Sequence, residues 1–287
     1  MTPRDLYLAG KLVEAITAAG EALKRKPTDT SGRYFLAELL CFAGEYERAD
    51  KHLDLITEQD PKAAVALALF RQLIRGEQAR QQFFAEGRVP EVLGPPSPRL
   101  QRHLQASIAL RMGNLAEART LLEEAGAPEV RGTCDGRPFT GFRDLDDLCA
   151  PVLEALTSTG KYFWVPVESV ESLQLRPPKR ARDLLWRQAQ LIIAGGPDGE
   201  VYLPCIYAGT AALTDNQLRL GRGTDWTSGD EGPIAGRGLK MFLIGDEART
   251  ILEFSEVSFE SPVPVNVQEG SGDSDTPSSA DERSSDV

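Results

Sequence analysis

The sequence predicts an α+β protein, with an amino-terminal α-helical repeat domain followed by a small antiparallel β-rich domain, either a sheet or a barrel. A spacing of 34 residues recurs in the first third of the chain. Helical periodicity then ends near Val130, where short β-branched and aromatic runs begin, and the chain closes on a stretch rich in Ser, Gly, Asp and Pro. We therefore expect helical repeats over 1–130, the β-rich domain over 131–261 and a disordered acidic tail over 262–287.

The helical repeats are predicted from pairs of identical residues 34 positions apart. Gly10 and Gly44 fall between two apolar helical patterns, where a tight turn favours a residue that tolerates positive φ. Ala15 and Ala49 follow at the same interval, and their small side chains let the second helix of each pair cross the first closely. This interval is the length of one tetratricopeptide helix pair, so the first third should form tetratricopeptide-like stacked pairs.

The repeat becomes irregular after its second unit. An apolar helix around Phe70 is followed by Gly76, where we expect a turn earlier than the repeat would place it. Gly113 and Ala118 then restate the turn of the second unit. A plain helical bundle whose turns share Gly and Ala is the alternative to a repeat array.

Strand signals occupy the next part of the chain. Residues 162–165 and 191–193 predict strands, and a glycine-rich turn after the second leads into a further apolar run to form a hairpin. Further strands are expected within 218–220, 241–244 and 251–259. A helix is predicted over 144–156, because its apolar residues recur on one helical face.

The charge of the chain excludes some classes of function. The net charge is -11, of which residues 262–287, with six acids and one base, contribute -5 and the remaining body -6. A general nucleic-acid binder would need a basic face, so no nucleic-acid partner is expected. The tail has no aromatic residue and cannot bury enough surface to offset its ordering entropy.

Localisation and cofactors follow from what the sequence lacks. No apolar stretch approaches the roughly 18 residues of a membrane-spanning helix, and the amino terminus does not have the pattern of a secretion signal. We therefore expect a cytoplasmic protein that does not insert into membranes. Cys41, Cys134, Cys149 and Cys205 form no CxxC pair, so neither a zinc site nor a disulfide framework is indicated and no cofactor is expected.

The densest acidic cluster in the body of the chain lies at 143–147. Asp144, Asp146 and Asp147 could hold a hard cation such as magnesium. On the predicted helix, however, Asp144 and Asp147 share a side that Asp146 does not, and the start of a helix favours acids. A structural role is the preferred interpretation. His52 and His103 lie on predicted helices and are expected to be partly exposed rather than catalytic.

Two other strings invite a functional interpretation. Residues 220–226 resemble a phosphate-binding loop but lack the third glycine of a dinucleotide motif and the Gly-Lys-Ser/Thr of a nucleotide loop. We expect Arg222 and Asp225 to fix this loop while Trp226 covers the edge of the sheet. In the same way, we expect Asp183 to fix its loop and Trp186 to cover the edge of the sheet. The preceding basic residues Lys179, Arg180 and Arg182 either face solvent or meet an acidic partner.

Several strings together resemble the ImpE family, also called TagJ, an accessory component of type VI secretion. They are DGRPF at 135–139, FRDLDD at 142–147, GKYFWVP at 160–166 with Trp164, PPKRARDLLW at 177–186, LGRGTDW at 220–226 and FLIGDE at 242–247. The resemblance covers nearly the whole chain except the tail. It implies a non-enzymatic adaptor that binds the small contractile-sheath subunit through a helix near that subunit's amino terminus. It also implies a link, through the sheath, to the ClpV-type AAA+ ATPase that disassembles contracted sheath.

A repeat array suits such a role, because a groove between helix pairs can receive one amphipathic helix. Repeat geometry predicts that the first helix of the second unit turns a set of side chains toward this groove: Tyr34, Glu38, Cys41 and Phe42. The alternative is an enzyme acting on a small phosphorylated or glycosidic substrate in a metal-assisted acidic cleft of the second domain. Its cleft would be formed by Asp144, Asp147, Asp183, Arg222 and Asp225. A scaffold that links the sheath to another component is a third possibility.

Overall fold

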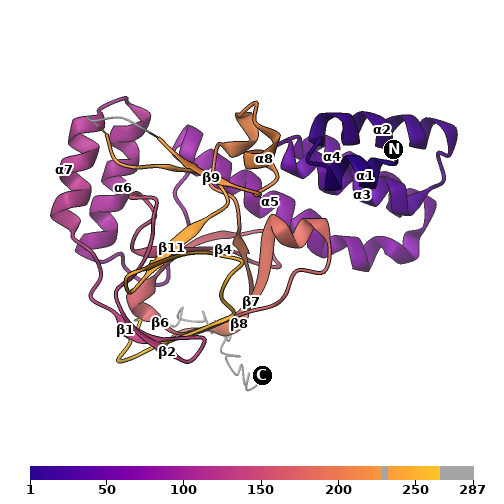
Figure 1. Ribbon diagram of the computed structural model, residues 1–287. Coiled ribbons are helices and arrows are strands. Elements are labelled where there is room, and N and C mark those ends of the chain that lie inside the picture. The colour runs from indigo at the N-terminus through magenta and orange to yellow at the C-terminus, as the bar shows by residue number, and fades with distance from the viewer. Residues whose placement is uncertain (228–231, 266–287) are drawn as a thin grey trace, which may run out of the picture.

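The amino-terminal part of the protein is a stack of antiparallel helical pairs (Figure 1). The computed structural model describes residues 1–227 and 232–265. The helices of the stack are α1 (Pro3–Leu8), α2 (Leu12–Arg25), α3 (Thr30–Phe42), α4 (Tyr46–Gln59) and α5 (Ala64–Glu86), with a 3-10 turn, η1 (Pro61–Ala63), before α5. Gly10 and Gly44 adopt φ of +78° and +75° in the α1–α2 and α3–α4 turns. The predicted repeat array is therefore confirmed.

Helix α5 corrects the prediction of a turn near Gly76. The helix runs unbroken for 23 residues, and Gly76 lies in its middle. A Cβ atom on Gly76 would lie 3.3 Å from Cδ2 of Leu156, which belongs to strand β4 (Val152–Leu156). The glycine therefore serves a close helix–strand approach and does not end the helix.

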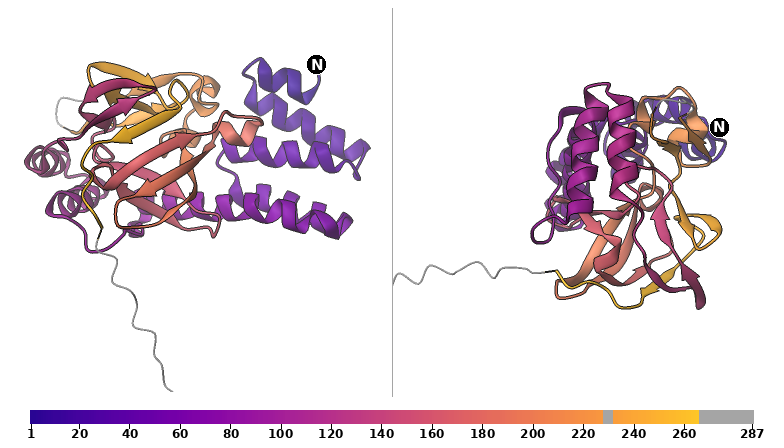
Figure 2. Two further views of the ribbon diagram at one scale, coloured as in Figure 1. Left: turned by 90° about the horizontal axis from the view of Figure 1, so that it is seen from below. Right: turned by 90° about the vertical axis from the view of Figure 1, so that its left-hand side faces the viewer.

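Helices α6 (Pro98–Arg111) and α7 (Leu115–Ala125) form a hairpin at the opposite end of the molecule from α1–α4 (Figures 1 and 2). This hairpin packs on the β-rich half and does not extend the array. Nδ1 of His103 in α6 lies 2.8 Å from the carbonyl oxygen of Leu148. His103 is buried, not partly exposed as predicted, and burial lowers its pKa to about 4.

Within the described residues, the second half is built from antiparallel strands arranged in three sheets. The eight-stranded sheet has the order β2-β1-β13-β6-β7-β8-β4-β5, the three-stranded sheet the order β12-β11-β3, and β9 pairs with β10. The remaining strands are β1 (Arg131–Cys134), β2 (Arg137–Thr140), β3 (Phe142–Asp144), β5 (Tyr162–Pro166), β6 (Val170–Leu175), β7 (Trp186–Ile193), β8 (Asp198–Pro204), β9 (Thr224–Trp226), β10 (Gly236–Gly238), β11 (Met241–Ile244), β12 (Glu247–Thr250) and β13 (Glu256–Phe259). Short helical turns connect them: η2 (Val167–Ser169), η3 (Ala181–Leu184), η4 (Thr210–Ala212) and α8 (Asn216–Arg219). This confirms the antiparallel β-rich half.

Two local predictions in this half are wrong. Residues 144–156 form the end of β3, a turn and β4 in place of a helix. Pro151 interrupts the segment, and every residue of β4 is buried, so its apolar spacing reflects burial on both faces and not a helical period. The strand expected within 218–220 is replaced by α8 and the turn that follows it.

Part of the eight-stranded sheet is buried on both faces, while β1 and β2 at one end keep exposed residues. One face carries Trp164 and Trp186 and belongs to the same hydrophobic core as the helices. The other carries residues such as Leu191, which pack with Phe142 and Phe242 of the three-stranded sheet. The boundary near residue 130 therefore separates helix from strand but does not separate the helices from a core that they share with the sheet. Of the predicted tail, residues 266–287 lie outside the described residues.

Candidate functional site

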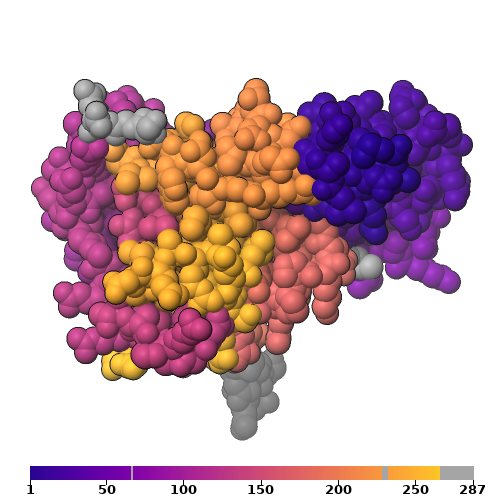
Figure 3. Space-filling model, viewed as in Figure 1, coloured from indigo at the N-terminus to yellow at the C-terminus, as the bar shows by residue number. Residues whose placement is uncertain are grey.

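The inner face of the helical array is covered by the second half of the same chain. Figure 3 shows segments of the β-rich half lying directly against the amino-terminal helices. Three segments make this contact: η3 with the residue before it, the start of β7, and α8 with the loop that follows. They come from the family-like strings at 177–186 and 220–226 and from the residues just before the second.

Helix α3 meets the first of these segments. Oε1 of Glu38 accepts a hydrogen bond from the backbone N–H of Arg182 at 3.2 Å, and Arg180 donates to the Tyr34 hydroxyl at 3.2 Å. The Arg182 guanidinium lies 5.1 Å from the ring centre of Phe70 in α5. Burial, the largest influence, raises the pKa of Glu38 to about 7, although the nearby arginines oppose this shift.

These contacts correct the predicted partner groove. Glu38, Cys41 and Phe42 are buried, with exposed fractions of 4%, 1% and 1%, and Tyr34 is half-buried under Arg180. Repeat geometry places these residues on the inner face as expected, but that face is not open. The predicted basic patch is also divided, because Arg182 is buried within this interface while Lys179 is exposed.

Helix α1 is held by the loop after α8. Arg222 donates to the carbonyl oxygens of Tyr7 at 2.6 Å and Leu8 at 2.9 Å, and its guanidinium lies 5.3 Å from the Tyr7 ring centre. A Cβ atom on Gly10 would lie 2.2 Å from Nε2 of Gln217, so this glycine permits a close approach as well as a turn. Arg222 therefore fixes α1 and not, as predicted, its own loop.

The remaining residues of that loop have separate surroundings. Asp225 is exposed, and Trp226 is half-buried with its ring centre 5.8 Å from that of Tyr207. The expectation that Trp226 covers the edge of a sheet stays a prediction.

Helix α5 meets the two fully buried tryptophans of the sheet. Nε1 of Trp186 donates to Oε2 of Glu77 at 2.9 Å, and the Trp186 ring lies edge-on to Phe70. Trp164 packs edge-on to Phe83 with 4.7 Å between ring centres. Both indoles therefore attach the sheet to one helix.

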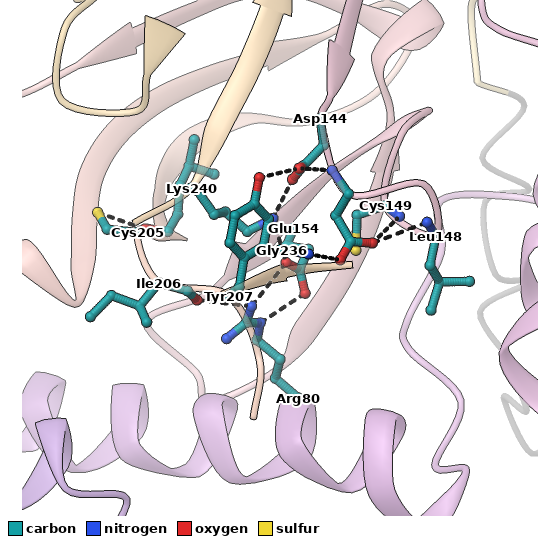
Figure 4. Close-up of polar contacts among 12 residues, drawn as sticks. Arg80, Asp144, Leu148, Cys149, Glu154, Cys205, Ile206, Tyr207, Gly236 and Lys240 are labelled. Atoms are coloured by element: carbon teal, nitrogen blue, oxygen red, sulfur yellow. Dashed lines mark hydrogen bonds and ion pairs between the residues drawn. The ribbon is translucent and has the colours of Figure 1, made fainter. Parts of the chain in front are cut away.

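Further along α5, Arg80 joins four side chains of the second half in a buried ionic cluster. We call it the Arg80 cluster, and its members are Arg80, Glu154, Lys240, Asp144 and Tyr207 (Figure 4). Nε and Nη2 of Arg80 donate to the two carboxylate oxygens of Glu154 at 2.8 and 3.0 Å, and Nη2 also donates to the carbonyl oxygen of Ile206 at 3.1 Å. Lys240 bridges Glu154, at 2.8 Å, and Asp144. The Tyr207 hydroxyl donates to Asp144 at 2.9 Å.

The charges of the Arg80 cluster stabilise one another. Burial opposes the charged forms, yet Arg80 and Lys240 hold the pKa of Glu154 far below its usual range, and Asp144 and Glu154 raise the pKa of Lys240. Neighbouring Asp146 differs, because burial and the charge of Asp144 raise its pKa to about 7. Removing one partner of a buried bidentate pair leaves the other charge without compensation.

The structure does not bring together the residues of the enzymatic alternative. Asp144 lies in the Arg80 cluster, while Asp147 pairs with Arg143 at 2.7 Å and accepts from the N–H of Ile234. Asp183 accepts backbone N–H groups at the start of η3. Within residues 1–227 and 232–265, no three His, Cys, Asp or Glu side chains are grouped so as to hold a metal ion.

The sequence patterns did not point to Arg80, Glu154 or Lys240. A signal was present for Glu154, which interrupts the apolar run of β4 and therefore had to find a buried partner. No local signal identified Arg80, which is separated from Glu154 by 74 positions.

Across the part of the chain that the structure describes, no helix is long and apolar enough to span a bilayer.

Fold and site together define a helical repeat protein whose array is joined to an antiparallel β-rich half through a buried ionic interface. The tetratricopeptide repeat family model matches residues 6–73, and the ImpE protein family model matches residues 136–258. The chain is 33% identical over 262 residues to the type VI secretion system accessory component TagJ of Pseudomonas aeruginosa strain PAO1, spanning 91% of this chain and 92% of that protein. This protein therefore belongs to the ImpE family of type VI secretion accessory components, as the resemblance of its strings predicted.

A solved structure shares this fold. The crystal structure of protein VPA1032 from Vibrio parahaemolyticus matches with a TM-score of 0.84 at 26% sequence identity. The match covers 90% of this chain and 97% of that one, so it includes both the helical array and the β-rich half.

Proposed function

We propose that this protein is a non-enzymatic adaptor of type VI secretion that binds the small contractile-sheath subunit through that subunit's amino-terminal helix. The observation that carries the proposal is the 33% identity, over 91% of the chain, to an accessory component of this secretion system. The repeat array supports it, because stacked helix pairs recognise peptides and helices through spaced contacts.

The chemistry of the interior supports binding rather than catalysis. The ionisable groups of the Arg80 cluster are committed to one another and to backbone groups, as expected of a structural network. A role beside the sheath would also place the protein in the cytoplasm, where sheath is assembled and recycled.

A link to the ClpV-type ATPase follows from sheath binding. An adaptor bound to the small subunit would accompany sheath to the ATPase that disassembles it. We therefore propose that the association with the ATPase depends on the sheath subunit and is not direct.

Isothermal titration calorimetry tests the first part of the proposal. The probe is a synthetic peptide of the sheath subunit's amino-terminal helix, and its control is the same composition in scrambled order. We expect saturable binding of the native peptide alone. Absence of binding both to this peptide and to the purified whole subunit would contradict the proposal.

Co-precipitation tests the second part. The purified ATPase should be retained on the immobilised protein when the sheath subunit is present and lost when it is omitted. Retention without the subunit would show a direct contact and replace the indirect link.

A large rise in melting temperature on adding magnesium or manganese would instead favour metal-dependent chemistry, since a ligand that prefers the folded state stabilises it.

A further inference from the structure

An open groove lies beside the covered inner face of the array. Its volume is about 420 Å³, within the range of ligand-binding pockets. The walls come from α5, the α3–α4 turn with the start of α4, and the segment around η4, and they include Gly44, Glu47, Gln78, Ala85, Glu86 and Ala211. We call this surface the α5 groove.

The length of the α5 groove matches two turns of a helix. Its longest wall runs along α5 from Gln78 to Glu86, which at 1.5 Å per residue spans about 12 Å, or roughly two helical turns. Apart from Tyr46 and Glu47, the lining outside α5 is made of small residues, and a Cβ atom on Gly44 would lie 3.0 Å from that of Ala211. Small side chains let the backbone of another helix approach closely.

The charge of the groove selects its occupant. Glu47 and Glu86 are the charged residues of the lining, and among the described residues no Lys, Arg or His lines it. Gln78 donates to Oε1 of Glu47 at 2.8 Å, which holds this carboxylate on the rim. Potentials of one sign favour partners of the other and repel like charges. The acidic stretch 262–287, with six acids and one base, is therefore unsuited to this groove.

We propose that the α5 groove receives two turns of a partner helix that directs a lysine or arginine toward Glu47 and Glu86. This inference rests on the proposed function, since the helix that we assign to the groove is that of the sheath subunit. It places the partner beside α5 and the α3–α4 turn and leaves the inner face occupied by this chain's own residues.

Steric and charge variants of the full-length protein test the groove with the sheath-helix peptide as the probe. Ala85→Arg fills the groove with a bulky cation on an exposed helical position, and should weaken peptide binding by more than about tenfold. Ala116→Arg, at an exposed position of α7, is the matched control and should bind as the native protein does. Melting temperatures of the two variants confirm that both are folded.

The charge variant is Glu47→Gln combined with Glu86→Gln. It should weaken binding about three- to tenfold at low salt, and the difference should shrink at high salt as the charges are screened. Glu14→Gln combined with Glu58→Gln makes the same change in net charge at exposed positions outside the groove and should leave the affinity unchanged.

The outcomes separate the two proposals. Native affinity in both groove variants, with the peptide still binding, would overturn the groove assignment and leave the adaptor function standing. Equal losses in the groove variants and their controls would also overturn it. Failure of the native protein to bind the peptide and the whole subunit would overturn both.

Discussion

The inner face of the array and the α5 groove share helix α5, yet they are filled differently. On the inner face, Glu38 and Trp186 make buried contacts between the two halves of the chain. In the groove, α5 presents amides and a small side chain to open space. A repeat array therefore does not imply that its inner face is available, because the chain can supply its own ligand for that face.

The two surfaces also differ in what a substitution should change. The inner face combines aromatic packing with buried charges, so its variants should alter the free energy of unfolding. The groove is lined by half-buried and exposed residues, so its variants should alter binding and leave stability nearly unchanged. Four variants of the inner interface test this distinction.

The largest effect is expected for Arg80→Met, because it leaves Glu77 buried without the cation that it pairs with and leaves Glu154 with Lys240 alone. We expect the free energy of unfolding to fall by about 3–5 kcal/mol in urea titrations. Arg75→Met, on an exposed position of the same helix, should change it by less than about 0.5 kcal/mol. Equal stability of the two variants would show that the Arg80 cluster is not an essential connection; if Arg80→Met is insoluble, Arg80→Lys provides the comparison.

Trp186→Phe should have the next largest effect. The phenyl ring cannot donate to Glu77, which leaves the buried carboxylate with one donor fewer and a small void beside it. We expect a loss of about 2–3 kcal/mol by the same titration. Trp226→Phe, at a half-buried position, should lose less than half as much. If Trp186→Phe leaves the free energy of unfolding unchanged, the contact that joins the two halves lies elsewhere.

Glu38→Gln should change how stability depends on pH. Burial raises the pKa of the native Glu38 to about 7 from an ordinary 4.5, so the folded state binds this proton more tightly than the unfolded state. Between pH 4.5 and 7 the native protein should lose this contribution as pH rises, and the loss is complete above pH 7.

The glutamine variant keeps an acceptor for Arg182 but does not titrate. Relative to the native protein it should therefore gain about 1–2 kcal/mol between pH 4.5 and 7.5, measured by urea unfolding at each pH. Glu58→Gln, at an exposed position, should show no such change. A constant difference across this range would show that Glu38 is ionised throughout.

The smallest effect is expected for Arg222→Met, because this arginine is itself exposed. Loss of its bonds to Tyr7 and Leu8 should release α1 locally, with less than about 1 kcal/mol of global destabilisation. Hydrogen exchange should accelerate several-fold within α1 and remain unchanged in α4. Asp225→Asn is the control, and similar exchange in both variants would assign α1 another anchor.

Local patterns predicted the helical array well. The turn at Gly44 and the crossing at Ala49 recur at the interval of one helix pair, and both depend on neighbours close in sequence. The role of Gly76 could not be predicted in this way, because it depends on contact with Leu156 in a distant strand. The apolar residues of 144–156 have helix-like spacing because β4 is buried on both faces, and Pro151 is a signal against a helix there.

The interface was less accessible to sequence reasoning than the fold. Tyr34, Glu38, Cys41 and Phe42 were correctly assigned to one helical face, but nothing local indicated what would cover that face. Glu38 meets a residue 144 positions away. The family-like strings at 177–186 and 220–226 drew attention to the right segments, and their role in covering the array became visible only in three dimensions.

Helix α5 belongs equally to the array, through Phe70, and to the sheet, through Phe83 and Arg80. Cutting the chain near residue 130 would remove the indole rings and carboxylates that contact half of this helix. The apolar and charged side chains of that half would then be exposed to water. Truncated proteins made to locate the partner-binding surface would then precipitate, and this loss would be mistaken for a loss of binding. Point substitutions in the intact polypeptide are the sound way to map this molecule.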